Sequence, residues 1–220
     1  MLWLAIIAAI FIAARAQDDA VAVEEHIPLE RNKTYLDGLL NKGKAQQVLD
    51  LFSDLTVIDP PEVTICIGRA YAQLGQYAKT ENLLKPYIAS TPDSVEALLT
   101  LGKVYVQVQR WNDAEQYLEK VISLDPTNHQ AFNFLGKVVL VRDQNSSKAK
   151  EYLSEAHRLD PTDENILFEY GMILLYNDEH DDAKEAFNKA ELLNKEMDHA
   201  ILGKIYLHYK HTDWYTQYSI

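Results

Sequence analysis

Histidine and cysteine are the side chains best suited to metal binding or catalysis, and their spacing in this chain favours neither. Among seven histidines, His208 and His211 share one helix face and Asp213 follows them. Two ligands from a single helical turn do not make a dedicated metal site. The lone cysteine, Cys66, lies in an apolar run, so we expect a small buried side chain rather than a reactive thiol. The chain also has no nucleophile elbow, phosphate loop or HExxH motif. We therefore predict no catalytic residue, no metal and no cofactor.

The balance of charge narrows the classes of function. Among 220 residues, 33 acidic and 21 basic side chains give a formal net charge of −12. Nucleic-acid binders need a basic surface for phosphate contacts, so this composition argues against that class. The hydrophobic fraction of 47% is ordinary for a globular protein and argues against wholesale disorder. A single cysteine excludes an intramolecular disulfide.

Glycine recurs along the chain at a nearly fixed interval. Gly68, Gly102, Gly136, Gly171 and Gly203 follow one another after 34, 34, 35 and 32 residues. Proline keeps a similar interval, and most of the glycines are followed by a small residue and then by leucine or phenylalanine: Pro60, Pro92, Pro126 and Pro161; Ala114 and Leu118, Ala149 and Leu153, Ala183 and Phe187. A repeat of this length indicates a helical solenoid.

Each recurring residue type has a physical role in a pair of helices. Glycine and alanine let two antiparallel helices cross closely, and proline ends the second helix before the next pair begins. The pattern resembles the tetratricopeptide repeat family over residues 29–220. The resemblance implies an all-α fold, a right-handed superhelical solenoid of antiparallel helix pairs. Its repeats would span 29–60, which is degenerate, 61–94, 95–128, 129–163, 164–195 and a partial capping repeat at 196–220.

The resemblance also implies a concave groove lined by the first helix of each pair, in which a partner protein binds. At the ninth repeat position, which faces the groove, four residues are basic: Arg69, Lys103, Lys137 and Lys204. Polar residues accompany this basic column, and apolar ones follow toward the C-terminus: Gln73, Gln107 and Asn133; Phe168, Met172 and Tyr176. Such a column would attract an acidic segment or a C-terminal carboxylate. The alternative is a solvated stripe without a ligand, in which lysine stems cover apolar surface.

Two specialised members of the family do not match this chain. Lys33 fits the carboxylate clamp of chaperone-binding domains, but Asp37, Cys66, Glu96 and Thr100 do not. The asparagine ladder of sugar-transferase repeats is also absent from the corresponding positions.

The N-terminal segment predicts export. Residues 2–14 carry no charge, and Ala14 and Ala16 give a small-x-small cleavage site, so we expect a signal peptide at 1–16 and a linker at 17–28. The chain would then reach the secretory pathway, the endoplasmic reticulum lumen or the extracellular space, or the periplasm of a bacterium. Glycosylation sequons at Asn32 and Asn145 agree with this route. The alternative is an uncleaved segment that tethers the protein to a membrane.

The C-terminal end of the array is aromatic, with Trp214, Tyr215 and Tyr218. These side chains either cap the last apolar face or dock on another protein.

Together these features predict a non-catalytic scaffold, adaptor or assembly factor that binds a protein or peptide partner. One alternative is a constitutive subunit of a complex, docked through the aromatic C-terminus. Another is a module that presents substrates to an enzyme encoded elsewhere. Oligomeric state is left open.

Overall fold

The computed structural model describes residues 32–52, 61–144 and 146–193. Ten α-helices and no strand make up the regular structure of these residues, so the described fold is all-α, as the repeat pattern predicts. The helices form two compact units, one in residues 1–76 and one in 77–220. Their bounds are α2 Lys33–Asn41, α3 Ala45–Asp50 and α4 Pro61–Gln73 in the first unit, and α5 Tyr77–Ser90, α6 Val95–Gln107, α7 Trp111–Leu124, α8 His129–Asp143, α9 Ser146–Leu159, α10 Glu164–Tyr176 and α11 His180–Leu193 in the second.

Polar side chains at the helix starts supply hydrogen-bond acceptors for the first backbone N–H groups. The Asn32 side chain accepts from the N–H of Tyr35 at 2.8 Å, and the Asn128 side chain accepts from Ala131 at 3.1 Å. Asp163 accepts from the N–H of Asn165 at 2.8 Å. These caps satisfy donors that the helix itself leaves without partners, and they fix where α2, α8 and α10 begin.

In the first unit, α4 packs on α2 and α3. Leu36, Leu40, Val48 and Cys66 are buried there with at most 1% of their surface exposed. The Cys66 thiol is completely buried, and its Sγ atom lies 3.8 Å from Oδ1 of Asp37. Cys66 is therefore a small core residue.

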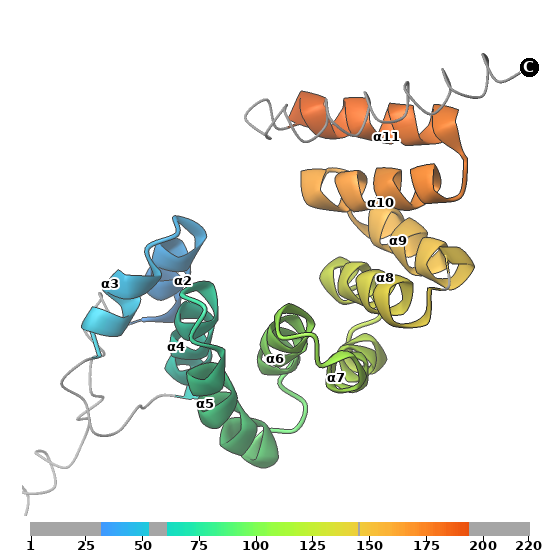
Figure 1. Cartoon of the computed structure of the whole chain (residues 1–220). Coiled ribbons are helices and arrows are strands. Elements are labelled where there is room, and N and C mark those ends of the chain that lie inside the picture. The colour runs from blue at the N-terminus through green and yellow to red at the C-terminus, as the bar shows by residue number, and fades with distance from the viewer. Residues whose placement is uncertain (1–31, 53–60, 145, 194–220) are drawn as a thin grey trace, which may run out of the picture. The chain divides into compact units, whose positions relative to one another are not determined.

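The second unit is a series of stacked helices (Figure 1). One core runs from α5 to α8 through Leu84, Leu101, Tyr105, Leu118 and Leu135, each at most 1% exposed. Smaller apolar clusters continue this packing through α8, α9, α10 and α11. Helices α7 and α9 each contact the first helix of their own pair and the first helix of the next pair, so these consecutive pairs share their cores.

Helices of this unit cross closely at the repeated glycines. A Cβ atom added to any of three glycines would lie 2.7 Å from a large side chain of the second helix: Gly102 against Leu118, Gly136 against Leu153, and Gly171 against Phe187. Carbon atoms in contact normally lie about 3.5–4.0 Å apart, so these positions admit only hydrogen without rearrangement. Glycine therefore recurs in the sequence because each of these helix pairs has no room for a side chain at the crossing.

Polar contacts tie neighbouring helices of the second unit together. The Tyr105 hydroxyl donates to Oε1 of Glu81 at 3.1 Å, and the Arg110 guanidinium lies 4.5 Å from the centre of the Tyr105 ring. Burial, together with the hydrogen bond to Glu81, raises the pKa of Tyr105 to about 12. The phenol therefore stays protonated and acts as a donor at neutral pH. On the next pair, Arg142 of α8 donates from Nη2 to Oε1 of Glu115 of α7 at 3.1 Å.

Replacing Glu115 with glutamine is expected to lower the free energy of unfolding by about 0.5–1 kcal/mol at pH 7. The hydrogen bond from Arg142 lowers the pKa of Glu115 in the folded state. A lowered carboxylate pKa gives stability that is present above the unfolded value of about 4.3 and is lost as pH falls through the folded value. Denaturant unfolding at pH 7 and pH 3 should therefore show a difference between wild type and Glu115→Gln that disappears in acid. A difference that persists at pH 3 would contradict this assignment.

Candidate functional site

Two lysine contacts join the first helices of consecutive pairs. Lys103 on α6 donates to Oε1 of Gln130 at the start of α8, at 2.6 Å. Lys137 on α8 forms an ion pair with Glu169 on α10, with 2.7 Å between Nζ and Oε1. Helices α6, α8 and α10 thus form one row, which we call the first-helix row, and it carries Lys103 and Lys137.

Phe134, a residue of α8, lies between Lys103 and Lys137. The Lys103 and Lys137 ammonium groups are 5.4 and 5.3 Å from the centre of its ring. At such distances the aromatic face attracts a cation. The ring and the hydrogen-bond acceptors therefore hold both ammonium groups at defined positions on the row.

Asn133, beside Phe134, is buried, and its side-chain oxygen has no hydrogen-bond partner among the described residues. Only 6% of its surface is exposed, and no donor in the described part of the chain reaches its Oδ1 atom. Leaving a buried acceptor without a hydrogen bond costs about 1–3 kcal/mol, but an oxygen enclosed in this way is also out of reach of a partner docked on the surface. Gln107, the other polar residue expected here, is exposed at the end of α6.

The acceptors of the two lysines are residues that the sequence argument missed. Gln130 and Glu169 both lie on the first helix of the repeat that follows their lysine. Glu169 offsets the charge of Lys137, so the row is less basic than its lysines alone suggest. The sequence alone could have indicated these pairs. When the repeats are aligned on one another, residues on neighbouring first helices can be matched by their positions in the repeat.

The C-terminal part of the row is apolar and partly exposed. Phe168 packs against Phe187 of α11, with ring centres 5.8 Å apart, and Met172 is half-buried. Tyr176 at the end of α10 is 61% exposed, and Val141 at the end of α8 is 57% exposed. Phe168 therefore has a structural contact, whereas Tyr176 and Val141 present apolar surface to solvent.

Arg69 and Gln73 lie on α4, in the unit of residues 1–76. Arg69 forms an ion pair with Asp37 of α2, and Nε2 of Gln73 donates to the Leu40 carbonyl oxygen at 3.2 Å. Both side chains therefore link α4 to α2.

Several predicted features lie outside the described residues. They are the signal segment 1–16, the linker 17–28, Asn145, Lys204, Trp214, Tyr215 and Tyr218. Asn32 is described, and its side-chain oxygen caps α2. Within the described ranges, no helix has the length and apolar character of a membrane span.

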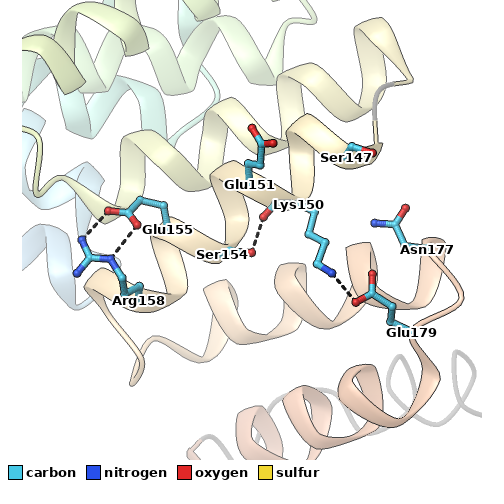
Figure 2. A pocket seen from close by; sticks show the side chains of 8 residues that line it. All are labelled: Ser147, Lys150, Glu151, Ser154, Glu155, Arg158, Asn177 and Glu179. Carbon is cyan, nitrogen blue, oxygen red and sulfur yellow. Dashed lines mark hydrogen bonds and ion pairs between the residues drawn. The ribbon is translucent and has the colours of Figure 1, made fainter.

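A polar hollow lies on α9 and the turn after α10 (Figure 2). Two ion pairs occupy it, Lys150 with Glu179 and Arg158 with Glu155, the latter at 2.6 Å. The Ser154 hydroxyl donates to the Lys150 carbonyl oxygen at 2.7 Å. No histidine lines this hollow beside the serine, so its lining residues do not form a nucleophile and base pair.

The repeat is recognised by comparison with known families. Sequence models of the tetratricopeptide repeat match residues 71–138 and residues 164–197. The chain contains tetratricopeptide repeats. The matched segments contain all three glycines, and they also contain the large residues that face Gly102 and Gly171. A sequence search of curated proteins finds no match.

Several solved structures resemble this chain in fold. MamA 41-end from Desulfovibrio magneticus RS-1 is 22% identical, with a TM-score of 0.56 over 76% of this chain and 94% of that one. MamA AMB-1 is 25% identical, with a TM-score of 0.57 over 74% and 97%. The APC/C hetero-tetramer Cut9–Hcn1 has a TM-score of 0.66 at 18% identity, over 82% of this chain and 33% of that one. These similarities concern the fold.

A tetratricopeptide repeat array is a protein-interaction scaffold, and proteins of this fold are typically non-catalytic. The fold thus supports a protein partner. Which partner it is depends on the surface, because one scaffold serves many unrelated roles.

Proposed function

We propose that this protein is a non-catalytic adaptor or assembly factor that holds a segment of a partner protein on the first-helix row. The pair of ammonium groups, Lys103 and Lys137, held beside Phe134 on adjacent first helices is the observation that carries the proposal. The repeat framework around these lysines would supply the rigid support that a preformed binding surface needs.

The chemistry around Asn133 suggests what the segment contains. Lys103 and Lys137 place two ammonium groups beside Phe134, which favours a carboxylate of the partner at this point. Val141, Met172 and Tyr176 then offer apolar contact farther along the row. We therefore expect a segment with an acidic residue followed or preceded by apolar anchors, or one that ends in its own C-terminal carboxylate.

The same proposal includes an exported or membrane-associated setting. Its support is the uncharged run at residues 2–14 with the small residues Ala14 and Ala16. N-terminal sequencing of the purified mature protein tests this part independently, since cleavage would leave Gln17 as the first residue. A protein that retains Leu2 and remains with membranes would instead support the anchored alternative.

Constitutive assembly remains an alternative mode. The solved neighbour Cut9 is part of a hetero-tetramer with Hcn1, so one protein of similar fold belongs to a hetero-oligomeric complex. In this mode the aromatic residues Trp214, Tyr215 and Tyr218 would dock on the partner. Deleting residues 212–220 should release such a partner and leave binding to the first-helix row unchanged. As a further alternative, the bound partner would be a substrate that the array presents to a separate enzyme.

Replacing Met172 and Tyr176 together by serine is expected to reduce partner recovery at least about fivefold, because it removes apolar anchors from the row. The measurement is quantitative affinity capture of the full chain from its own cells, followed by mass spectrometry. Leu124→Ser is the matched control, since Leu124 is a 39% exposed leucine on the second helix α7. Equal recovery by wild type and the double variant would contradict binding at this row.

A further inference from the structure

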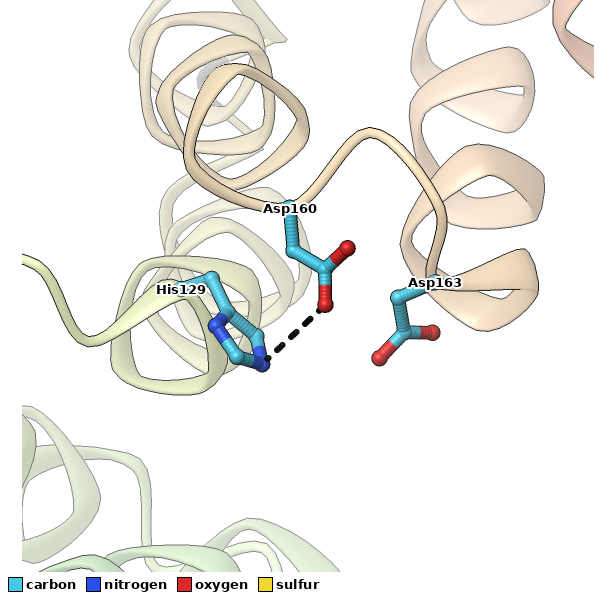
Figure 3. Close-up of side chains that lie close together, drawn as sticks. All are labelled: His129, Asp160 and Asp163. Carbon is cyan, nitrogen blue, oxygen red and sulfur yellow. Dashed lines mark ion pairs between the residues drawn. The ribbon is translucent and has the colours of Figure 1, made fainter.

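Three metal-binding side chains converge where the repeat 129–163 meets the next one (Figure 3). His129 is the first residue of α8, Asp160 follows the end of α9, and Asp163 caps the start of α10. One ligand atom of each lies within 4.8 Å of the others, and all three residues are partly buried. His129 Nε2 is 3.8 Å from Oδ2 of Asp160. The cluster therefore joins three helices and combines an imidazole with two carboxylates.

Hydrogen bonds within the turn hold one oxygen of each carboxylate. Oδ1 of Asp160 accepts from the backbone N–H of Thr162 at 3.0 Å and from the Thr162 hydroxyl at 2.8 Å. Oδ1 of Asp163 accepts from the N–H groups of Asn165 and Ile166 at 2.8 and 3.2 Å. The carboxylates are thus fixed by their turn.

The preceding repeat shows what the same turn looks like without this cluster. There Asp125 makes the same contacts with Thr127, but Asn128 takes the place of Asp163 and donates from Nδ2 to Oδ2 of Asp125 at 3.1 Å. The residue that corresponds to His129 one repeat earlier is Val95. A carboxylate has no N–H group, so Asp163 cannot donate a hydrogen bond to Asp160 as Asn128 does to Asp125. The turn at 160–163 therefore brings two carboxylates together, whereas the turn at 125–128 joins one carboxylate to an amide. A cation bound here would compensate the negative charge of these carboxylates, and His129 supplies an imidazole nitrogen as a further ligand.

From this convergence we propose that His129, Asp160 and Asp163 bind one divalent transition-metal ion of the Zn²⁺ type. Zinc takes histidine nitrogen and aspartate oxygen at about 2.0–2.2 Å, and three protein ligands with water complete its usual coordination. Ligand atoms around such an ion lie about 3.4 Å apart, so the three side chains need only a small inward rotation. An imidazole ligand favours Zn²⁺ over Ca²⁺, which prefers oxygen alone. The ion would fasten α8, α9 and α10 together at the boundary between two repeats.

The test is calorimetric titration of the full chain, purified without a histidine tag, with Zn²⁺ and separately with Ca²⁺. We expect one Zn²⁺ per chain, an increase of the melting temperature on binding, and no comparable response to Ca²⁺. His129→Gln, Asp160→Asn and Asp163→Asn should each weaken Zn²⁺ binding by about tenfold or more. The Asp163→Asn change should keep the helix cap, because Asn128 performs that role in the preceding repeat.

Two controls separate this site from other histidines and from a general charge effect. Asp125→Asn removes one carboxylate from the corresponding turn and should leave Zn²⁺ binding unchanged. The double variant His208→Ala, His211→Ala removes the other candidate pair and should also retain the site. Zn²⁺ binding that survives in His129→Gln and Asp163→Asn, or that disappears only with His208 and His211, would overturn the proposal, as would absence of binding by the wild type. Failure here would leave the partner-binding proposal intact, since the two use different residues.

Discussion

Replacing Gly136 by valine is expected to lower the free energy of unfolding by about 2–3 kcal/mol. A Cβ atom at this position would lie 2.7 Å from Cγ of Leu153 and 3.3 Å from the carbonyl oxygen of Ala149. The first contact is with the branch point of a buried leucine and the second is with backbone, so neither can move aside freely. Helices α8 and α9 would have to separate. Denaturant unfolding followed by circular dichroism measures the change.

Gly38→Ala is the matched control for this steric argument. Gly38 also lies inside a helix, but a Cβ atom there would meet nothing within 4 Å. Alanine should be neutral or should stabilise by up to about 1 kcal/mol, since it favours helix more than glycine does. Combining Gly136→Val with Leu153→Ala should cost less than the sum of the two single changes, because space opened by the second relieves the first. Unchanged stability of Gly136→Val would contradict the close crossing.

Replacing both Lys103 and Lys137 by glutamate is expected to weaken binding of an acidic partner segment roughly 10- to 100-fold. The change removes two ammonium groups that lie 5.4 and 5.3 Å from the Phe134 ring centre, and it places new carboxylates beside Glu169. Fluorescence anisotropy with acidic peptides, measured at low and high salt, gives the affinity. Wild-type binding should weaken with salt, as interactions between exposed charges do. The Lys→Gln pair should show a smaller loss, because it removes charge without adding repulsion.

Lys120→Glu together with Lys184→Glu is the control for net charge. These lysines lie on the second helices α7 and α11, and the double replacement changes the formal charge by the same amount. It should leave affinity for the acidic peptide nearly unchanged. An equal loss in both double variants would mean that total charge, rather than the first-helix row, governs binding. No loss in either would mean that Lys103 and Lys137 are solvated residues without a ligand.

Much of the fold follows from the sequence because its strongest constraints are local and repeated. Gly102, Gly136 and Gly171 each face a large residue 16 or 17 positions farther along the chain, so a nearly constant interval predicts which helices cross. Turn residues such as Asp125 and Asp160 likewise act on neighbours two residues away. These interactions do not depend on the rest of the molecule, and the resulting expectation of an all-α helical repeat is confirmed for the described residues.

The candidate site is harder to predict from the sequence than the fold, because its contacts join residues of different repeats. The pairing of Lys137 with Glu169 and the burial of Asn133 depend on how one first helix lies beside the next. The approach of His129 to Asp160 depends on the same stacking, and the spacing of histidines along the chain gave no sign of it. Repeat phase can align such residues, but the rotation of each helix decides which of them meet.

Site-specific photocrosslinking in the protein's own cells tests the central claim, that a partner binds on the first-helix row, most directly. A photoreactive amino acid would replace Val141 or Tyr176, which are 57% and 61% exposed on α8 and α10, and, as controls, Gln116 or Lys184, which are exposed on α7 and α11. The account predicts that one protein is captured from both Val141 and Tyr176 and not from either control. Capture of that protein only from Gln116 or Lys184, or equally from all four positions, would contradict it.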